Sequence, residues 1–358
     1  MRPLLAAPAT LELLAAALDG TGSALLPTTE ARVLAALRPD EPLEYDDVAV
    51  VVPTSGSTGE PKGVLLTADN LTTSARASAQ HLGGQGQWLL AIPSTHIGGL
   101  QVLVRSLLAG TEPVTLEGPT TVEAFEAATG QLTSLRRYVS LVPTQLQRLI
   151  DSPALLEYDA ILLGGAAAPE SLLAAARDRG ARVVTTYGMS ETSGGCVYDG
   201  VPLSGVTVSA DERIRLCGPV VGRGYRLQPD LTAAAFDGGC FTTADLGRVE
   251  GNVLTVIGRA DDVIVTGGEK VAPAAVEAAL ADHTAVEQVA VVGVADQEWG
   301  MRVRAVVVLT PGASLTLEQA RDHVAGTLPR THAPRELVVL DALPLLDSGK
   351  IDRMRLTR

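Results

Sequence analysis

The chain has 358 residues, 46% of them hydrophobic, and a formal net charge of −13 at pH 7. This length exceeds one typical domain and suits two, with enough apolar residues for a buried core. The negative charge and the lack of a Lys/Arg cluster argue against nucleic acid or an anionic membrane as a partner. We therefore expect small-molecule substrates, and the sequence is compatible with a homo-oligomer.

Residues 1–18 superficially resemble a signal peptide, but a proline and a glutamate interrupt them. No apolar run approaches the roughly 20 residues that a membrane span needs, so we interpret this segment as a strand or loop followed by an amphipathic helix. Cys196, Cys217 and Cys240 lack the spacing of a zinc site, and their odd number does not indicate a disulfide framework. The sequence thus predicts a soluble protein of the reducing cytoplasm.

Apolar runs rich in Val, Ile and Leu alternate with Ala-rich helical stretches over the first two-thirds of the chain. This alternation is typical of a mainly parallel sheet covered by helices, so the predicted fold class is α/β. The predicted strands are 48–52, 88–92, 138–141, 160–163 and 182–186, and the predicted helices are 68–81, 96–109, 122–131, 143–151 and 169–179.

After Gly205 the pattern changes to short strands broken by Gly, Pro and Asp, which indicates a small antiparallel or barrel-like subdomain. From residue 259 helices and strands alternate again, as in a compact α+β domain of about 100 residues. We therefore predict an N-terminal domain over 1–258 and a C-terminal domain over 259–358. The predicted strands of these parts are 213–216, 224–227, 253–256, 286–294, 302–309 and 336–340, and the predicted helices are 272–281 and 317–328.

The loop 54–64 is the most informative segment, because it combines glycines, hydroxyls and one lysine directly after the predicted strand 48–52. Glycines let backbone N–H groups approach phosphate oxygens, hydroxyls add donors, and a lysine offsets part of the phosphate charge. The loop lacks the Walker A pattern, and a Ser/Gly-rich linker is the alternative that composition allows. The predicted phosphate-binding residues are Thr54, Ser55, Gly56, Ser57, Thr58, Gly59 and Lys62.

Three further segments carry candidate nucleotide contacts. In 185–192, Glu191 follows a tight glycine turn; Mg²⁺ usually takes one or two carboxylates plus nucleotide phosphates, so Glu191 is a candidate magnesium ligand. A glutamate that stabilises a helix N-terminus is the alternative. Segment 163–169 is a strand-to-helix turn whose glycines permit close approach of a flat ring. In 242–247, Asp245 can accept hydrogen bonds from both ribose hydroxyls.

Together with segment 258–277, these motifs resemble those of adenylate-forming enzymes, the acyl-CoA synthetase and ligase superfamily, and they occur in the same order. The resemblance implies a large N-terminal domain for ATP and an acid, with a small β subdomain, and a small mobile C-terminal domain. It implies Mg²⁺ as cofactor and ATP and CoA as co-substrates. It assigns the adenine to Gly165, Ala166 and Tyr187, and the ribose to Asp245 and Arg259, and it adds Gly188 to the ATP-binding residues.

Two positions in these nucleotide-binding motifs depart from the family's pattern. Ser190 replaces the usual threonine of Tyr-Gly-x-Thr-Glu but keeps a hydroxyl. The resemblance therefore implies catalytic roles for Ser190 and Glu191, with Glu191 also as the metal ligand. Ala244 stands where a glycine is usual, which leaves the neighbouring Asp245 intact.

The resemblance also makes Asp261 the hinge between the domains. It assigns Gly267, Gly268 and Lys270 to a loop that faces the active site during thioester formation, with an exposed turn lysine as the alternative for Lys270. Lys350 matches the family's Gly-Lys-x-x-Arg segment, whose lysine bridges the substrate carboxylate and the α-phosphate. A cation there counters the charge that repels a carboxylate from a polyanion.

Segment 93–110 sets His96 at the start of a predicted helix and Arg105 within that otherwise apolar helix. It resembles the matching segment of o-succinylbenzoate–CoA ligases of menaquinone biosynthesis, particularly the short actinobacterial type. In those enzymes the arginine of this helix binds the aromatic carboxylate that is not activated. The resemblance assigns Arg105 to that carboxylate and His96 to the substrate or thioester channel; a salt bridge is the alternative for Arg105.

The implied reaction forms o-succinylbenzoyl-CoA in two halves. The succinyl carboxylate attacks the α-phosphate of ATP and releases pyrophosphate, and the CoA thiol then displaces AMP. Another aryl- or acyl-CoA ligase, or a stand-alone adenylation enzyme, is the nearest alternative. A non-catalytic nucleotide-binding protein is the alternative from another class. The retention of Lys62, Glu191, Asp245, Arg259 and Lys350 speaks against it.

Overall fold

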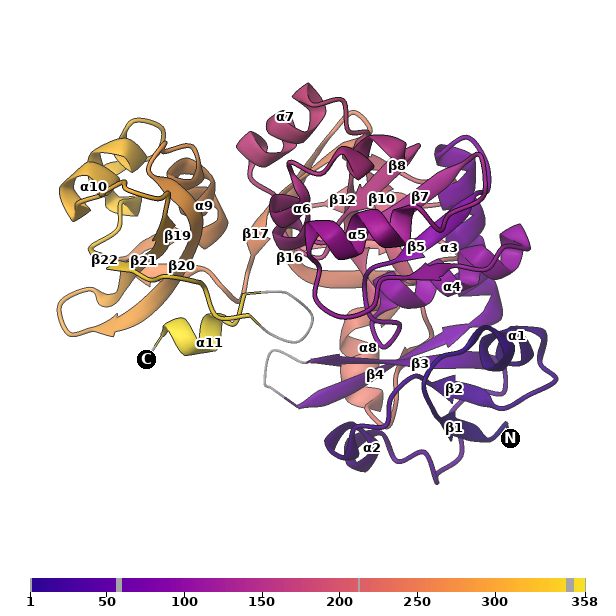
Figure 1. The fold of residues 1–358 in the computed structure, drawn as a ribbon. Coiled ribbons are helices and arrows are strands. Elements are labelled where there is room, and N and C mark those ends of the chain that lie inside the picture. The colour runs from indigo at the N-terminus through magenta and orange to yellow at the C-terminus, as the bar shows by residue number, and fades with distance from the viewer. Residues whose placement is uncertain (1, 56–59, 212, 346–350, 358) are drawn as a thin grey trace.

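The computed structural model describes residues 2–55, 60–211, 213–345 and 351–357. Within these residues the strands form four sheets. Figure 1 shows the chain coloured from the indigo N-terminus to the yellow C-terminus. Three sheets are built from residues up to Arg259, and the fourth from the residues that follow.

The first sheet has the strand order β1-β2-β3-β4-β14. Its first three strands are parallel, whereas β4 runs antiparallel to β3 and β14 antiparallel to β4. The sequence analysis grouped strand 48–52 with the later parallel strands. The structure instead places it in this first sheet as β3, so the predicted phosphate loop connects the antiparallel strands β3 and β4. The bounds are β1 (Leu4–Ala6), β2 (Ala24–Leu26), β3 (Val48–Ser55), β4 (Pro61–Thr67), β14 (Gly224–Tyr225), α1 (Leu11–Asp19) and α2 (Ala31–Leu37).

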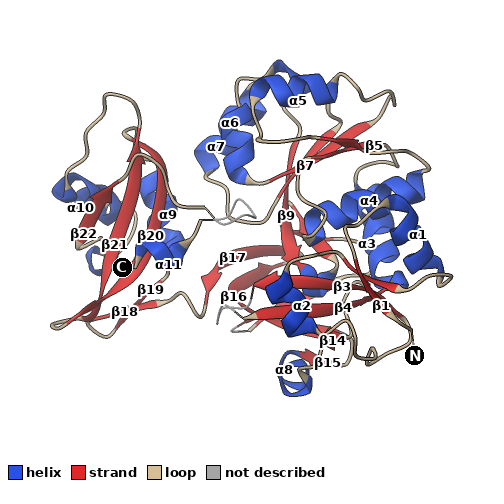
Figure 2. Ribbon diagram, turned by 60° about the horizontal axis from the view of Figure 1, so that its bottom comes forward, coloured by secondary structure: helices blue, strands red, loops and turns tan. Residues whose placement is uncertain are grey.

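The second sheet has the order β11-β10-β9-β8-β7-β5-β6 and is parallel from β9 to β6. Trp88 packs in one core cluster and the adjacent Leu89 in another, because successive side chains point to opposite faces. Figure 2 shows α3 and α4 on one side of β5 and β7, and α5, α6 and α7 on the other. Burial on both faces accounts for the near-continuous apolar strands that the sequence displays.

The predicted strands and helices of this region are confirmed, with ends that shift by a few residues. Helix α3 agrees fully, because Thr67 and Asn70 form a reciprocal capping box at its start. The strands are β5 (Gln87–Leu90), β6 (Val114–Thr115), β7 (Arg137–Leu141), β8 (Ala160–Leu163), β9 (Val183–Met189), β10 (Gly194–Tyr198) and β11 (Val201–Pro202). The helices are α3 (Ala68–His81), α4 (Ile97–Ala109), α5 (Val122–Thr129), α6 (Pro143–Leu149), α7 (Glu170–Asp178) and the 3₁₀-helices η1 (Pro153–Glu157) and η2 (Ser190–Thr192).

The third sheet is antiparallel, with the order β12-β13-β16-β15 and β17 beside β16. It matches the predicted small β subdomain, except that the predicted strand 224–227 is shorter and pairs with β4 instead. The elements are β12 (Thr207–Ala210), β13 (Arg213–Cys217), β15 (Phe236–Asp237), β16 (Cys240–Glu250), β17 (Val253–Arg259) and α8 (Pro229–Ala235).

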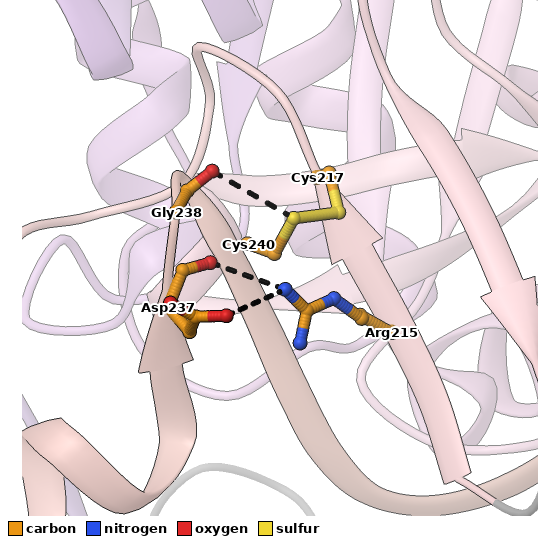
Figure 3. The surroundings of a disulfide bond; sticks show 5 residues. All are labelled: Arg215, Cys217, Asp237, Gly238 and Cys240. Carbon is orange, nitrogen blue, oxygen red and sulfur yellow. Dashed lines mark hydrogen bonds and ion pairs between the residues drawn. A yellow bond between two sulfur atoms is a disulfide. The ribbon is translucent and has the colours of Figure 1, made fainter.

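A disulfide joins Cys217 on β13 to Cys240 on β16, as Figure 3 shows. The expectation of no disulfide is therefore wrong for this pair. The two cysteines are 23 residues apart in sequence and become direct neighbours through the strand register, which their spacing does not reveal. Beside them the Arg215 guanidinium donates to the Asp237 carboxylate at 3.3 Å, and Cys196 remains a buried free thiol.

The fourth sheet has the order β19-β18-β21-β20, with β22 parallel to β21. Its core clusters contain described residues from Ile264 onward, whereas the clusters of the other sheets end at Leu254. Separate cores suit two domains, and the boundary at 258/259 stays a prediction. The elements are β18 (Ile264–Thr266), β19 (Glu269–Val271), β20 (Val286–Asp296), β21 (Gly300–Leu309), β22 (Glu336–Val339), α9 (Pro273–Ala281), α10 (Leu317–Ala325), η3 (Arg330–His332) and α11 (Arg353–Leu356).

Candidate active site

The β3–β4 hairpin presents Lys62, the cation of the predicted phosphate loop. Lys62 lies on β4 directly opposite Thr54 on β3, and Ser55 ends β3. The Lys62 Nζ atom lies 5.5 Å from the centroid of the Tyr225 ring. The remaining residues predicted for this loop, Gly56, Ser57, Thr58 and Gly59, lie outside the described residues.

Glu191 lies in η2, directly after β9, and is half-buried. The Tyr225 hydroxyl donates a hydrogen bond of 2.7 Å to Glu191 Oε1. Burial, and then the neighbouring Glu191 carboxylate, raise the pKa of Tyr225 above its usual value, so this hydroxyl stays a donor at neutral pH. Lys62, Tyr225 and Glu191 come from three segments that are distant in sequence, and the fold places Tyr225 in contact with the other two.

The turn that carries Ser190 and Glu191 depends on close backbone contact between β9 and β10. A Cβ atom on Gly188 would lie 2.2 Å from the Gly194 carbonyl oxygen, so glycine is required there. The Thr192 hydroxyl accepts from the Met189 N–H at 3.0 Å and donates to the Gly194 carbonyl at 2.9 Å. Ser190 is buried at the start of this turn. The sequence between β9 and β10 therefore fixes the direction in which Glu191 leaves the sheet.

Asp245 lies at the centre of a second polar group. The Tyr187 hydroxyl donates to Asp245 Oδ2 at 2.7 Å, and the Arg259 guanidinium lies 3.5 Å from Asp245 Oδ1. Arg259 also donates to Asp261 at 3.3 Å. Burial, and then the Asp245 carboxylate, raise the pKa of Tyr187 above its usual value. The structure therefore brings together the residue predicted for the adenine face, the two predicted for the ribose and the predicted hinge residue.

Gly165 and Ala166 follow β8, whose carboxyl end lies beside that of its parallel neighbour β9. Both are exposed, and Gly165 has φ 83°, a conformation that favours glycine. The neighbouring Gly164 leaves no room for a side chain, because a Cβ atom would lie 2.4 Å from Thr186 Oγ1. This turn therefore lies at the same sheet edge as Tyr187.

His96 and Arg105 lie on α4 but at different depths in the fold. His96 is the N-cap residue, and Arg105 follows nine residues later, about 13 Å along a helix axis. Arg105 is 7% exposed and donates to Ser78 Oγ at 3.1 Å and to the Tyr198 hydroxyl at 3.3 Å. Its guanidinium lies 4.7 Å from the Trp88 ring centroid. Among the described residues no carboxylate pairs with it, so the salt-bridge alternative is not seen there.

The cavity beside Arg105 has a volume of about 10 Å³, which is room for one water molecule. Its wall includes Trp88 and Tyr138, near the amino ends of β5 and β7, whereas Tyr187 and Gly188 lie near the carboxyl end of β9. Burial lowers the pKa of Arg105, and its Nε atom has no partner among the described residues. The structure thus does not bring Arg105 to the other candidate residues, and its contact with an aromatic carboxylate stays a prediction.

The C-terminal candidate residues lie on the β18–β19 hairpin. Gly267 and Gly268 form its turn with φ of 58° and 85°, and Lys270 is exposed on β19 opposite Val265. A Cβ atom on Gly267 would lie 2.6 Å from the Trp299 ring, so the turn requires glycine at this position. Lys350 lies outside the described residues.

Sequence reasoning missed Tyr225, which it treated as part of a subdomain strand. The available signal was the glycine spacing before it. Gly224 has φ 135°, and a Cβ atom there would lie 2.3 Å from Thr232 Cγ2. Gly222 leaves no room for a side chain either, with Leu65 O at 2.8 Å from a built Cβ atom. Two positions that require glycine shortly before Tyr225 indicate a tightly placed segment.

Comparisons with known proteins identify the family of this chain. Residues 6–228 match the family model of AMP-binding enzymes, and residues 275–350 match that of the AMP-binding enzyme C-terminal domain. The chain therefore belongs to the family of AMP-binding, adenylate-forming enzymes. This result confirms the resemblance drawn from the motifs.

Within this family, the chain is similar to 2-succinylbenzoate–CoA ligases. The chain is 50% identical to a probable 2-succinylbenzoate–CoA ligase of Mycobacterium tuberculosis, with 95% of this chain and 92% of that protein covered. It is 35% identical to the 2-succinylbenzoate–CoA ligase of Geobacillus kaustophilus, over 97% and 76% of the two chains. The solved structure of o-succinylbenzoate CoA synthetase (MenE) from Bacillus subtilis with OSB-AMP superposes with a TM-score of 0.77 at 29% identity, over 98% and 81% of the chains. The predicted α/β adenylating-enzyme fold is confirmed.

No helix in the described part of the chain is long and apolar enough to cross a membrane.

Proposed function

We propose that the protein is an ATP-dependent acid–thiol ligase that joins o-succinylbenzoate to CoA through an acyl-adenylate, a step of menaquinone biosynthesis. The observation that carries this proposal is the 50% identity to a probable 2-succinylbenzoate–CoA ligase over 95% of the chain. The polar groups around Glu191 and Asp245 support the proposal.

In the first half-reaction a carboxylate oxygen of the acid bonds to the α-phosphorus, and the bond from that phosphorus to pyrophosphate breaks. Lys62 offsets phosphate charge, while Asp245 accepts hydrogen bonds from the ribose hydroxyls. Arg259 supports Asp245 from the neighbouring strand at 3.5 Å. Lys350 would bridge the acid carboxylate and the α-phosphate, where it counters their mutual repulsion.

Magnesium is proposed as the cofactor, with Glu191 as its protein ligand. Glu191 Oε1 accepts a hydrogen bond from the Tyr225 hydroxyl, and no hydrogen bond to Oε2 is found among the described residues. In the described part of the chain, no group of three or more acidic, His or Cys side chains is arranged so that it could hold a metal ion. An ion at Glu191 would be held by one carboxylate and by the nucleotide phosphates, whose charge it would neutralise. A Bacillus subtilis MenE structure contains ATP and a magnesium ion.

In the second half-reaction the CoA sulfur bonds to the acyl carbon, and the bond from that carbon to the AMP oxygen breaks. We assign the β18–β19 turn, with Gly267, Gly268 and Lys270, to this half, after a rotation about Asp261. His96, at the start of α4, is assigned to the substrate or thioester channel. The water-soluble substrates ATP and CoA support a cytoplasmic location.

The test is a pyrophosphate-release assay with ATP, Mg²⁺ and CoA against a panel of acids. The panel contains o-succinylbenzoate, benzoate, a medium-chain fatty acid and several amino acids. We expect selective turnover of o-succinylbenzoate, with its CoA thioester detected by mass spectrometry. Turnover of another acid alone would contradict the proposed substrate. Nucleotide binding without turnover of any acid would favour a non-catalytic nucleotide-binding protein.

A further inference from the structure

Tyr225 contacts two charged residues of opposite sign that come from different segments of the chain. We propose that Tyr225 is a positioning residue for magnesium-dependent ATP binding, whose hydroxyl orients the Glu191 carboxylate and whose ring supports the Lys62 ammonium group. The inference deepens the proposed function and rests on its assignment of Glu191 to the metal and Lys62 to the phosphates.

The hydroxyl is placed to fix the carboxylate. It donates to Glu191 Oε1 at 2.7 Å, which limits rotation of the carboxylate. A backbone hydrogen bond joins the same two segments, because the Gly222 N–H donates to the Glu191 carbonyl oxygen at 2.9 Å. Groups that hydrogen-bond to a metal ligand set its orientation, and their loss commonly weakens metal binding about 10- to 100-fold.

The ring is placed to hold the lysine. Tyr225 pairs with Val64 across β14 and β4, and Lys62 lies two residues before Val64 on the same face of β4. Diagonal neighbours in antiparallel strands are within reach of aromatic and long side chains. The Lys62 Nζ atom is 5.5 Å from the ring centroid, within the distance at which a ring face attracts a cation.

Tyr225 is itself rigidly held, as a positioning residue must be. Its N–H donates to Thr232 Oγ1 at 2.9 Å, and its ring packs edge-on against Phe236 with centroids 5.2 Å apart. The next residue, Arg226, is 1% exposed, and its guanidinium fixes β14 to the segment after α2. That guanidinium donates to the Glu44 carboxylate and to the carbonyl oxygens of Leu37, Arg38, Glu41 and Pro42.

Tyr225→Phe tests the hydroxyl, because it keeps the ring and removes the donor. ATP binding is measured by calorimetry without acid or CoA, in EDTA and at a series of MgCl₂ concentrations. We expect unchanged ATP affinity in EDTA and about a 10-fold higher MgCl₂ concentration for half-maximal gain in affinity. The matched control is Tyr158→Phe, which removes another buried hydroxyl that bonds to Thr129 at 2.6 Å, and it should retain the wild-type magnesium dependence.

Glu191→Gln provides the second arm. If the hydroxyl acts through Glu191, adding Tyr225→Phe to Glu191→Gln should change the magnesium dependence by less than twofold, because the two losses are then not additive. Tyr225→Leu removes the ring as well, and it should also weaken ATP binding in EDTA, through Lys62.

A Tyr225→Phe protein with the wild-type magnesium dependence would overturn the inference, whatever happens to its thermal stability. An equal shift in Tyr158→Phe would also overturn it, since the effect would then be general to lost buried hydrogen bonds. The assay contains no acid, so it separates this inference from the proposed substrate. If the wild type activates a different acid while Tyr225→Phe shifts the magnesium dependence as expected, the substrate is wrong and the inference holds.

Discussion

Asp245 and Arg259 face each other across the antiparallel pair β16 and β17, with the guanidinium 3.5 Å from the carboxylate. Tyr187, which lies on β9, donates a hydrogen bond of 2.7 Å from its hydroxyl to the other carboxylate oxygen of Asp245. Two sheets thus contribute to one polar group. The proposed ribose ligand is therefore oriented by its neighbours before a nucleotide binds, which reduces the cost of ordering it on binding.

Asp245→Asn should weaken ATP binding and leave the fold intact. The substitution replaces a charged acceptor with an amide, and a hydrogen bond to a charged group contributes about 1.5–3 kcal/mol, so we expect the KM for ATP to rise about 10- to 100-fold. Pyrophosphate release at varied ATP concentrations measures this. Asp237→Asn is the matched control, because Asp237 also pairs with an arginine, at an exposed site on β15. Equal ATP dependence in both variants would contradict the ribose assignment.

Arg105→Met should make the protein more stable and less active on o-succinylbenzoate. Burying a charge costs free energy, and among the described residues no carboxylate offsets the charge of Arg105, so an apolar side chain of similar volume should stabilise the fold. If Arg105 binds the free carboxylate after a rearrangement of its cavity, kcat/KM for o-succinylbenzoate should fall far more than for a monoacid. Urea unfolding and the acid panel measure the two effects. Lower stability with an unchanged ratio between the acids would show a structural arginine instead.

The sequence predicts elements whose signals are local and misses relations that depend on long-range pairing. Helix 68–81 is predictable because Thr67 and Asn70 mark its start. The pairing of β14 with β4 joins residues about 160 positions apart, so no local pattern reveals that Tyr225 lies beside Lys62. The same holds for Cys217 and Cys240, whose contact depends on the register of β13 and β16. Asp245 and Arg259 were predicted together because the family resemblance gives meaning to the spacing between their two segments.

Removing the disulfide should lower the free energy of unfolding by about 3 kcal/mol under oxidising conditions, as expected for closure of a loop of this size. Cys217 and Cys240 are 23 positions apart in the sequence. Urea unfolding of Cys217→Ser/Cys240→Ser, with and without dithiothreitol, measures this free energy. The reductant should abolish the difference from the wild type.

A thiol titration of the unreduced protein is the control. Burial raises the pKa of the free thiol Cys196 to about 12, so this thiol should react slowly with the reagent. Two fast-reacting thiols in the unreduced protein would show that the bond is absent.

The free energy of unfolding should fall as the pH rises above about 10. Burial raises the pKa of Tyr158. Burial also raises the pKa of Tyr187, and the neighbouring Asp245 carboxylate raises it further. Below the unfolded pKa of about 10 both states keep the phenolic protons. Above it the unfolded chain releases them while the folded chain retains them, so the folded state binds more protons and stability falls. Tyr158→Phe removes one such group, and urea unfolding between pH 8 and about 11 should give a shallower slope. A slope equal to that of the wild type would contradict the assignment.

Lys350→Ala should separate the two halves of the proposed reaction. The lysine counters repulsion between the acid carboxylate and the α-phosphate, and single electrostatic groups of this kind contribute about 10²- to 10³-fold to a rate, so adenylation should slow by that factor. Thioester formation from the pre-formed acyl-adenylate involves no such repulsion and should change little. Lys270→Ala is the matched control, because Lys270 is an exposed lysine on β19 that is assigned to the second half. It should slow thioester formation and spare adenylation. Equal loss of both halves in either variant would contradict the division of roles between the two lysines.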